Sequence, residues 1–244
     1  MTARDLYQAG ELQEAVRALS AEVRDHPTDS QRRTFLFELL CFAGDFERAE
    51  KQLDVLAESG GNAQLGCLLY RSALHAERER QEAFRKKEYA KDGDPAQSVP
   101  VSGTLNGRPF HFLSDADPRI GPRLEIFAAG SYLWIPFRHI ASIEMEPPKR
   151  LRDLIWIPAL VRTGPSFEGR ELGEILLPVL TPFCSRHPDD QVRLGRATVW
   201  EEDDEGRVVP AGQKMLIADE EEVPLLELRH LEFDAPASAA QAVN

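Results

Sequence analysis

The sequence predicts an α+β protein, with a helical N-terminal part followed by a β-rich C-terminal part. Residues 2–91 contain a single proline and are rich in Ala, Leu, Glu and Arg, which favour helices. From Pro95 onward, prolines and glycines recur every few residues, and β-branched and aromatic residues form short runs typical of strands. We therefore expect a helical domain over 1–93 and a β-rich domain over 94–244, with a disordered tail at 235–244.

A spacing of 34 residues relates two stretches of the helical part. It links Ala9-Gly10-Glu11-Leu12 with Ala43-Gly44-Asp45-Phe46, Ala15 with Ala49, and Leu19 with Leu53. This is the period of tetratricopeptide repeats, in which the glycine would form the turn between two antiparallel helices. The spacing predicts a tetratricopeptide-like helical repeat, and an ordinary helical bundle is the alternative. Helices are expected at 2–9, 11–25, 29–42, 45–58 and 62–90.

The C-terminal part predicts a mixed, mainly antiparallel sheet of short strands. Asn106-Gly107 is a strong hairpin signal, because both residues tolerate positive φ. A second hairpin is expected around Ala129-Gly130, which separates two apolar runs. The number of short strands favours a small curled sheet or a barrel. Further strands are expected at 154–161, 173–179, 196–201, 214–218 and 225–233, and a helical turn at 137–142.

The charge balance excludes some classes of partner. The chain has 41 acidic and 29 basic residues, for a net charge of −12. Nucleic acids and anionic membrane surfaces attract clustered Lys and Arg, so we expect neither as a partner. No apolar run approaches the roughly 20 residues of a membrane helix, and the N-terminus lacks the pattern of a signal peptide. With three scattered cysteines, the expected setting is the reducing cytoplasm.

Few residues suggest catalysis. Asp115 and Asp117 resemble an Asp-x-Asp pair that binds a divalent ion, but Pro118 follows at once and Asp-Pro also initiates turns. Phosphate-binding glycine loops and nucleophile elbows are absent from the sequence. We therefore expect no cofactor, no metal and no enzymatic activity. A divalent-metal-dependent enzyme that uses the two aspartates is the alternative, and a purely structural scaffold is a third.

Three segments concentrate tryptophan and arginine, which are enriched at binding hot spots and are also common in cores. The apolar face of the predicted helix 29–42 adds two phenylalanines. Composition alone leaves core packing and partner binding as alternatives. The candidate partner-binding residues are Trp134, Phe137, Arg152, Trp156, Arg196, Trp200, Phe35 and Phe42.

The order of these segments resembles the ImpE/TagJ family of accessory proteins of the bacterial type VI secretion system. The most specific stretch is Glu146-Pro-Pro-Lys-Arg-Leu-Arg-Asp-Leu-Ile-Trp156. It is accompanied by Asp115-Ala-Asp-Pro-Arg-Ile-Gly121, Tyr132-Leu-Trp-Ile-Pro-Phe137 and Leu194-Gly-Arg-Ala-Thr-Val-Trp200. The resemblance extends from about residue 2 to residue 233.

The resemblance implies a cytoplasmic, non-catalytic adaptor. Members of the family are associated with the contractile sheath and bind its small subunit through a helical segment of that subunit. They are thought to influence sheath assembly or its recycling by the sheath-disassembling AAA+ ATPase, which would be an indirect partner. The family carries no catalytic motif that can be transferred to this sequence.

Overall fold

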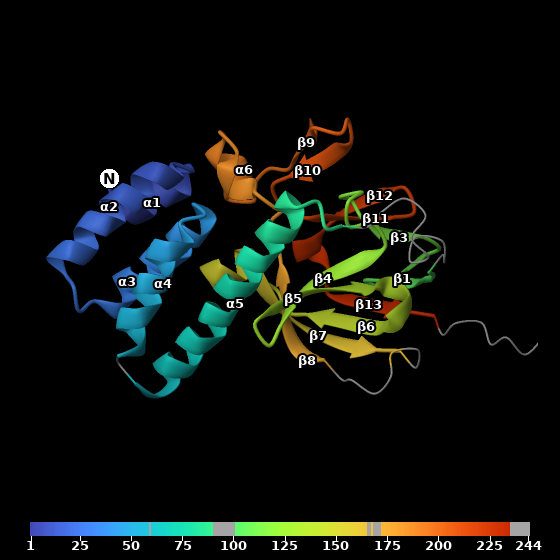
Figure 1. Ribbon diagram of the computed structural model, residues 1–244, viewed down its shortest axis with the longest axis horizontal. Coiled ribbons are helices and arrows are strands. Elements are labelled where there is room, and N and C mark those ends of the chain that lie inside the picture. The colour runs from blue at the N-terminus through green and yellow to red at the C-terminus, as the bar shows by residue number, and fades with distance from the viewer. Residues whose placement is uncertain (59, 90–100, 165–166, 168–171, 235–244) are drawn as a thin grey trace, which may run out of the picture.

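The computed structural model describes residues 1–58, 60–89, 101–164, 167 and 172–234. A stack of helices occupies one side of the molecule and an antiparallel sheet the other, with helix α5 lying between them (Figure 1). This confirms the α+β class. The predicted domain boundary at residue 93 and the predicted disorder of 235–244 fall outside the described residues.

Five helices form the N-terminal part. Four lie close to the predicted ranges, whereas the helix predicted at 62–90 ends at Arg85. The five helices are α1 (Ala3–Ala9), α2 (Leu12–Asp25), α3 (Ser30–Phe42), α4 (Phe46–Ala57) and α5 (Gly61–Arg85). Each helix packs against the next one in the chain. Among the described residues, no helix combines the length and the apolar character needed to span a membrane.

The repeated glycines lie at equivalent turns. Gly10 follows α1 with φ +87° and Gly44 follows α3 with φ +71°, a left-handed conformation that favours glycine. Asp29 and Asp45 cap α3 and α4 with their side chains, which accept hydrogen bonds from Arg32 N and Arg48 N. The 34-residue spacing thus corresponds to two similar helical pairs, while their assignment to the tetratricopeptide class stays a prediction.

Eight strands form one sheet in the order β2-β1-β13-β6-β7-β8-β4-β5. These strands are β1 (Gly103–Leu105), β2 (Arg108–Phe110), β4 (Arg123–Ala128), β5 (Ser131–Pro136), β6 (Ile140–Met145), β7 (Trp156–Thr163), β8 (Gly173–Pro178) and β13 (His230–Phe233). Smaller sheets join β9 (Val199–Glu202) to β10 (Val208–Ala211), and β3 (Leu113–Asp115) to β11 (Met215–Ala218) and β12 (Glu221–Pro224).

Both predicted hairpins are present. Asn106 and Gly107 form the two-residue turn between β1 and β2, and Ala129 and Gly130 the turn between β4 and β5, all with positive φ.

Four expectations need correction. The strand predicted at 225–233 is a 3₁₀ turn over Leu225–Glu227 followed by β13, and the helical turn predicted at 137–142 covers only Phe137–His139, before β6 begins. Every strand pairing among the described residues is antiparallel, so the sheet is not mixed, and the large sheet ends at β2 and β5 instead of closing into a barrel.

The sheet has a core on each face. On one face, Phe127, Trp156 and Leu176 pack into the same apolar cluster as the buried residues of the helices. On the other face, Ile126 and Leu177 belong to a second cluster closed by smaller strands and the C-terminal segment. Neighbouring residues along each strand point to opposite faces, which explains this division. The helices and the sheet therefore share one core.

A buried ion pair joins α5 to the sheet. The guanidinium of Arg80 binds both carboxylate oxygens of Glu125 on β4, at 2.8 and 2.9 Å, and both side chains are almost completely buried. Lys214 contacts the same carboxylate and also binds Asp115 at 2.5 Å. Burial alone would raise the pKa of Glu125, but the cations of Arg80 and Lys214 hold it well below its usual range.

The segment around the short helix α6 (Asp190–Arg193) joins the helical turns to the sheet part. The Asp190 carboxylate accepts a 2.7 Å hydrogen bond from Leu12 N, which caps α2. Arg196 donates to the carbonyls of Tyr7 and Gln8 at the end of α1, at 2.7 and 3.1 Å. At the second turn, a Cβ on Gly44 would lie 2.8 Å from Ser185 Cβ.

The Arg80–Glu125 pair makes a stability prediction. R80M should lower the free energy of unfolding by about 3–5 kcal/mol, because it leaves a buried carboxylate short of a partner. The matched control is R78M, on the same helix, whose ion pair with Glu50 is about 40% exposed and should contribute less than about 1 kcal/mol. Urea unfolding measures both. Equal losses would contradict a special role for Arg80.

Gly44 makes a second prediction. G44A should be more destabilising than G107A, although both glycines have positive φ and each alanine costs about 1–2 kcal/mol for that reason. Only the added methyl at position 44 meets another segment, whereas nothing lies within 4 Å of it at position 107. Overpacking against Ser185 should add about 1–3 kcal/mol. Thermal unfolding of the two variants tests this, and similar losses would refute the close contact.

Candidate partner-binding site

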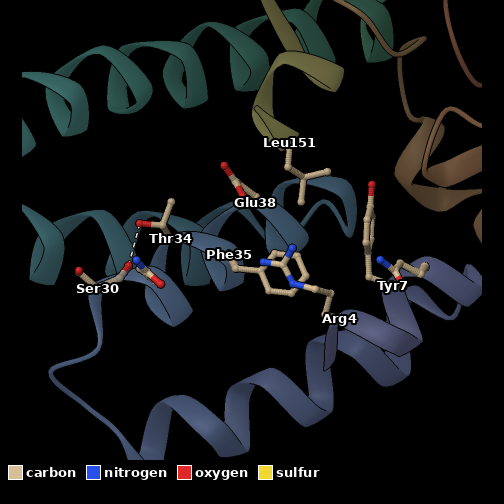
Figure 2. Close-up of a pocket in the computed structure, with 9 residues that line it drawn as sticks. Arg4, Tyr7, Ser30, Thr34, Phe35, Glu38 and Leu151 are labelled. Carbon is tan, nitrogen blue, oxygen red and sulfur yellow. Dashed lines mark hydrogen bonds between the residues drawn. The ribbon is translucent and has the colours of Figure 1, made fainter. Parts of the chain in front are cut away.

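An open cavity of about 480 Å³ lies on the helical part, between α1, α3 and the 3₁₀ turn η3 (Leu151–Leu154). Figure 2 shows side chains from the two helices meeting across it, with Leu151 reaching in from η3. A cavity of this size accepts a few side chains of a partner. It is lined by Arg4, Tyr7, Gln8, Ser30, Gln31, Thr34, Phe35, Glu38 and Leu151.

Two aromatic rings and a cation form the centre of the cavity. Tyr7 and Phe35 meet edge to face with centroids 5.9 Å apart, and the guanidinium carbon of Arg4 lies 5.5 Å from the centroid of the Phe35 ring. Arg4 makes no ion pair within the described part of the chain. The cavity therefore offers an apolar surface next to the Arg4 cation, which has no carboxylate partner among the described residues. Such a surface suits a binding partner that presents an apolar side chain beside an acidic side chain.

An ion pair lies at the edge of the cavity. Arg152 on η3 binds Glu38 on α3 at 3.1 Å, and its guanidinium carbon lies 5.0 Å from the centroid of the Tyr70 ring on α5. Burial raises the pKa of Glu38, and the Arg152 cation opposes this effect. Arg152 is thus engaged within the molecule, where it holds α3, α5 and η3 together.

Three of the candidate partner-binding residues belong to the cores, which corrects the prediction for them. Phe42, Phe137 and Trp156 are each at most 1% exposed. Phe42 and Trp156 lie in the core shared by the helices and the sheet, and Phe137 stacks on Phe233 with centroids 5.7 Å apart. Apolar side chains at these positions stabilise the fold and are inaccessible to a partner. Core packing, the other alternative, accounts for all three.

The remaining candidates divide between internal contacts and the surface. Trp134 is half-buried and packs against Phe84 of α5, with ring centroids 6.1 Å apart. Arg196 is exposed, but its guanidinium is engaged by the end of α1. Trp200 is 40% exposed and lies on β9. Phe35 lies in the cavity on the helical part, far from Trp200 in the sequence. The structure brings no pair of the predicted aromatic residues together into one exposed site.

Asp115 and Asp117 are both paired with basic side chains. Asp115 binds Lys214, and burial raises its pKa to about 6. Asp117 binds Arg119 at 2.6 Å and also accepts from Arg119 N in the turn that the Asp-Pro sequence predicts. No group of three or more His, Cys, Asp or Glu side chains suited to a metal lies among the described residues. These observations support a structural role for the two aspartates.

Sequence reasoning missed Arg4 and Tyr7. Both lie three residues apart on α1 and so point to the same side of that helix, which the sequence could have indicated. That this side faces Phe35 depends on how α1 packs against the other helices, and local spacing does not show it.

Comparisons with known proteins agree with this fold. The family model described as ImpE protein matches residues 107–232. The type VI secretion system accessory component TagJ of Pseudomonas aeruginosa is 33% identical over 268 aligned residues, which cover 96% of this chain and 92% of that protein. A crystal structure of a Vibrio parahaemolyticus protein has the same fold, with a TM-score of 0.82 and 22% identity over 96% of this chain and 98% of the other. This chain therefore belongs to the ImpE family.

Proposed function

We propose that this protein is a non-catalytic, cytoplasmic adaptor of a type VI secretion system. It binds the small subunit of the contractile sheath through a helical segment of that subunit, and so influences sheath assembly or recycling by the sheath-disassembling ATPase. Membership of the ImpE family supports the accessory role, because the Pseudomonas relative is a type VI secretion system accessory component. The binding step is what the resemblance to the ImpE/TagJ family implies, and the cavity is the surface on which we place it.

The observation that carries the binding step is the cavity in which Arg4, without an ion pair among the described residues, lies beside Phe35. Helical repeats bind peptides on the concave surface of the stack, where each repeat contributes side chains. Here α1 and α3, the first helices of the two 34-residue units, both line the cavity. We therefore place the partner on this surface of a tetratricopeptide-like stack and not on the sheet.

Two of the candidate aromatics distinguish this surface from the sheet part. F35A should weaken binding of the small sheath subunit at least tenfold, because Phe35 provides the apolar floor beside Arg4. W200A should leave the affinity within about twofold, since Trp200 lies on the β9–β10 ribbon. Calorimetric titration of the full chain with the purified subunit measures both variants.

A second variant shows whether a loss of binding in F35A is due to a folding defect. T34W would fill the cavity from its wall without removing packed atoms, and it should also abolish binding while the melting temperature stays the same. Loss of binding in W200A alone would move the site to the sheet part. No association of the wild-type chain with the subunit, in titration or in a pull-down from the native bacterium, would overturn the proposal.

A further inference from the structure

The N-terminal half of α5 exposes three leucines on one side. Leu65, Leu68 and Leu69 are 68%, 59% and 47% exposed, and their i, i+3, i+4 spacing places them together on the helix surface. We call them the leucine stripe. Single exposed leucines are common on protein surfaces, but an apolar row along one helix marks a surface that binds something.

The 34-residue spacing extends from α3 into α5. Leu36 and Leu40 of α3 are buried, and 34 residues later Tyr70 and Leu74 of α5 are buried as well. The two helices therefore turn equivalent positions toward the core. Exposed positions related by the same spacing must then face the same side of the helical stack.

This relation connects the leucine stripe to the cavity. Subtracting 34 from Leu65, Leu68 and Leu69 gives Gln31, Thr34 and Phe35, which all line the cavity on α3. The three leucines of the stripe therefore occupy, on α5, the positions equivalent to those that line the cavity on α3. Equivalent positions on successive helices of a stack form one continuous surface.

Contacts between the two helices support this continuity. The rings of Phe37 on α3 and Tyr70 on α5 have centroids 5.8 Å apart. Arg152 reaches both helices, through its ion pair with Glu38 and its contact with Tyr70. The Phe37–Tyr70 contact brings α3 and α5 together, and we infer from it that the surface of the cavity extends over α5 as a groove, with an apolar end at the leucine stripe and a cationic end at Arg4.

We propose that this groove binds a single amphipathic helix, with apolar side chains on the leucine stripe and a carboxylate that pairs with Arg4. The inference rests on the proposed function and specifies its binding surface. An amphipathic helix presents apolar residues at i, i+3 and i+4, which matches the stripe, and acidic residues at its border would complement Arg4. In a symmetric dimer of this chain, the leucine stripe of one copy would pack against the stripe of the other. Such a dimer would not provide a carboxylate for Arg4.

The first test places a charge in the leucine stripe. L68E should weaken binding of the purified small sheath subunit to the full chain at least tenfold, with an unchanged melting temperature, because Leu68 is mostly exposed. The control is L133E, at a leucine 47% exposed on β5, which should bind within twofold of wild type. Sedimentation of both variants shows whether the chain self-associates.

The outcomes separate this inference from the proposed function. If L68E binds the sheath subunit normally while F35A loses binding, the binding site is confined to the cavity, and the proposed groove over α5 is wrong. A wild-type dimer that L68E dissociates, without any effect on binding of the sheath subunit, would identify the occupant as a second copy and also overturn it. Absence of binding by the wild-type chain would instead refute the proposed function.

The second test reverses the charge at Arg4. R4E should weaken binding at least tenfold, and replacing one acidic residue of the partner helix by lysine should restore most of it. R17E is the control, since Arg17 is also an exposed arginine of the helical part but does not line the cavity. If R4E binds as wild type, or if no lysine replacement in the partner helix restores the loss, the pairing with Arg4 is wrong.

Discussion

The burial of Arg80 against Glu125 is the constraint on which the arrangement of helices and sheet depends. Both side chains are almost fully removed from solvent, and an unpaired charge in such a place would cost several kcal/mol. Helix α5 must therefore cross the β4–β5 hairpin in the register that keeps the pair together. Since α4 packs on α5 and each earlier helix packs on the one that follows it, this register also sets the direction of the whole stack.

The segments that make the sequence recognisable serve this junction. Trp156 fills the shared core, Arg152 connects η3 to Glu38, and Arg196 binds the end of α1. At this junction Trp156 supplies a large apolar surface, and Arg152 and Arg196 supply long cationic side chains. The same residue types are abundant at binding hot spots, so their presence alone does not identify a binding surface.

These contacts show that the sheet part and the α6 segment support the helical stack. The sheet and the α6 segment hold the turns of the helical pairs, with Asp190 at the start of α2 and Ser185 against Gly44. A helical stack supported in this way is pre-organised, which lowers the entropy cost of binding a partner. Under the proposed function, the stack binds the sheath subunit and the sheet keeps the groove in shape.

Local structure was predictable from the sequence by itself. Four of the five helix ranges, both positive-φ hairpin turns and the repeated glycines depend on neighbouring residues only, so their signals lie within a few positions of each other. The apolar pattern of the predicted helix 29–42 also marked Phe35 as part of an apolar helix face, although the cavity beside it needs Arg4 and Tyr7 of α1.

Only the tertiary structure decided which aromatic and charged residues are buried. Trp156 and Trp200 look alike in the sequence, yet one is 1% and the other 40% exposed. Arg80 pairs with Glu125, 45 residues away in the sequence, and Arg196 binds the Tyr7 carbonyl, 189 residues away. Local sequence patterns do not indicate contacts at such separations. Burial and pairing of this kind depend on how whole elements pack, because long-range contacts form only when the core assembles.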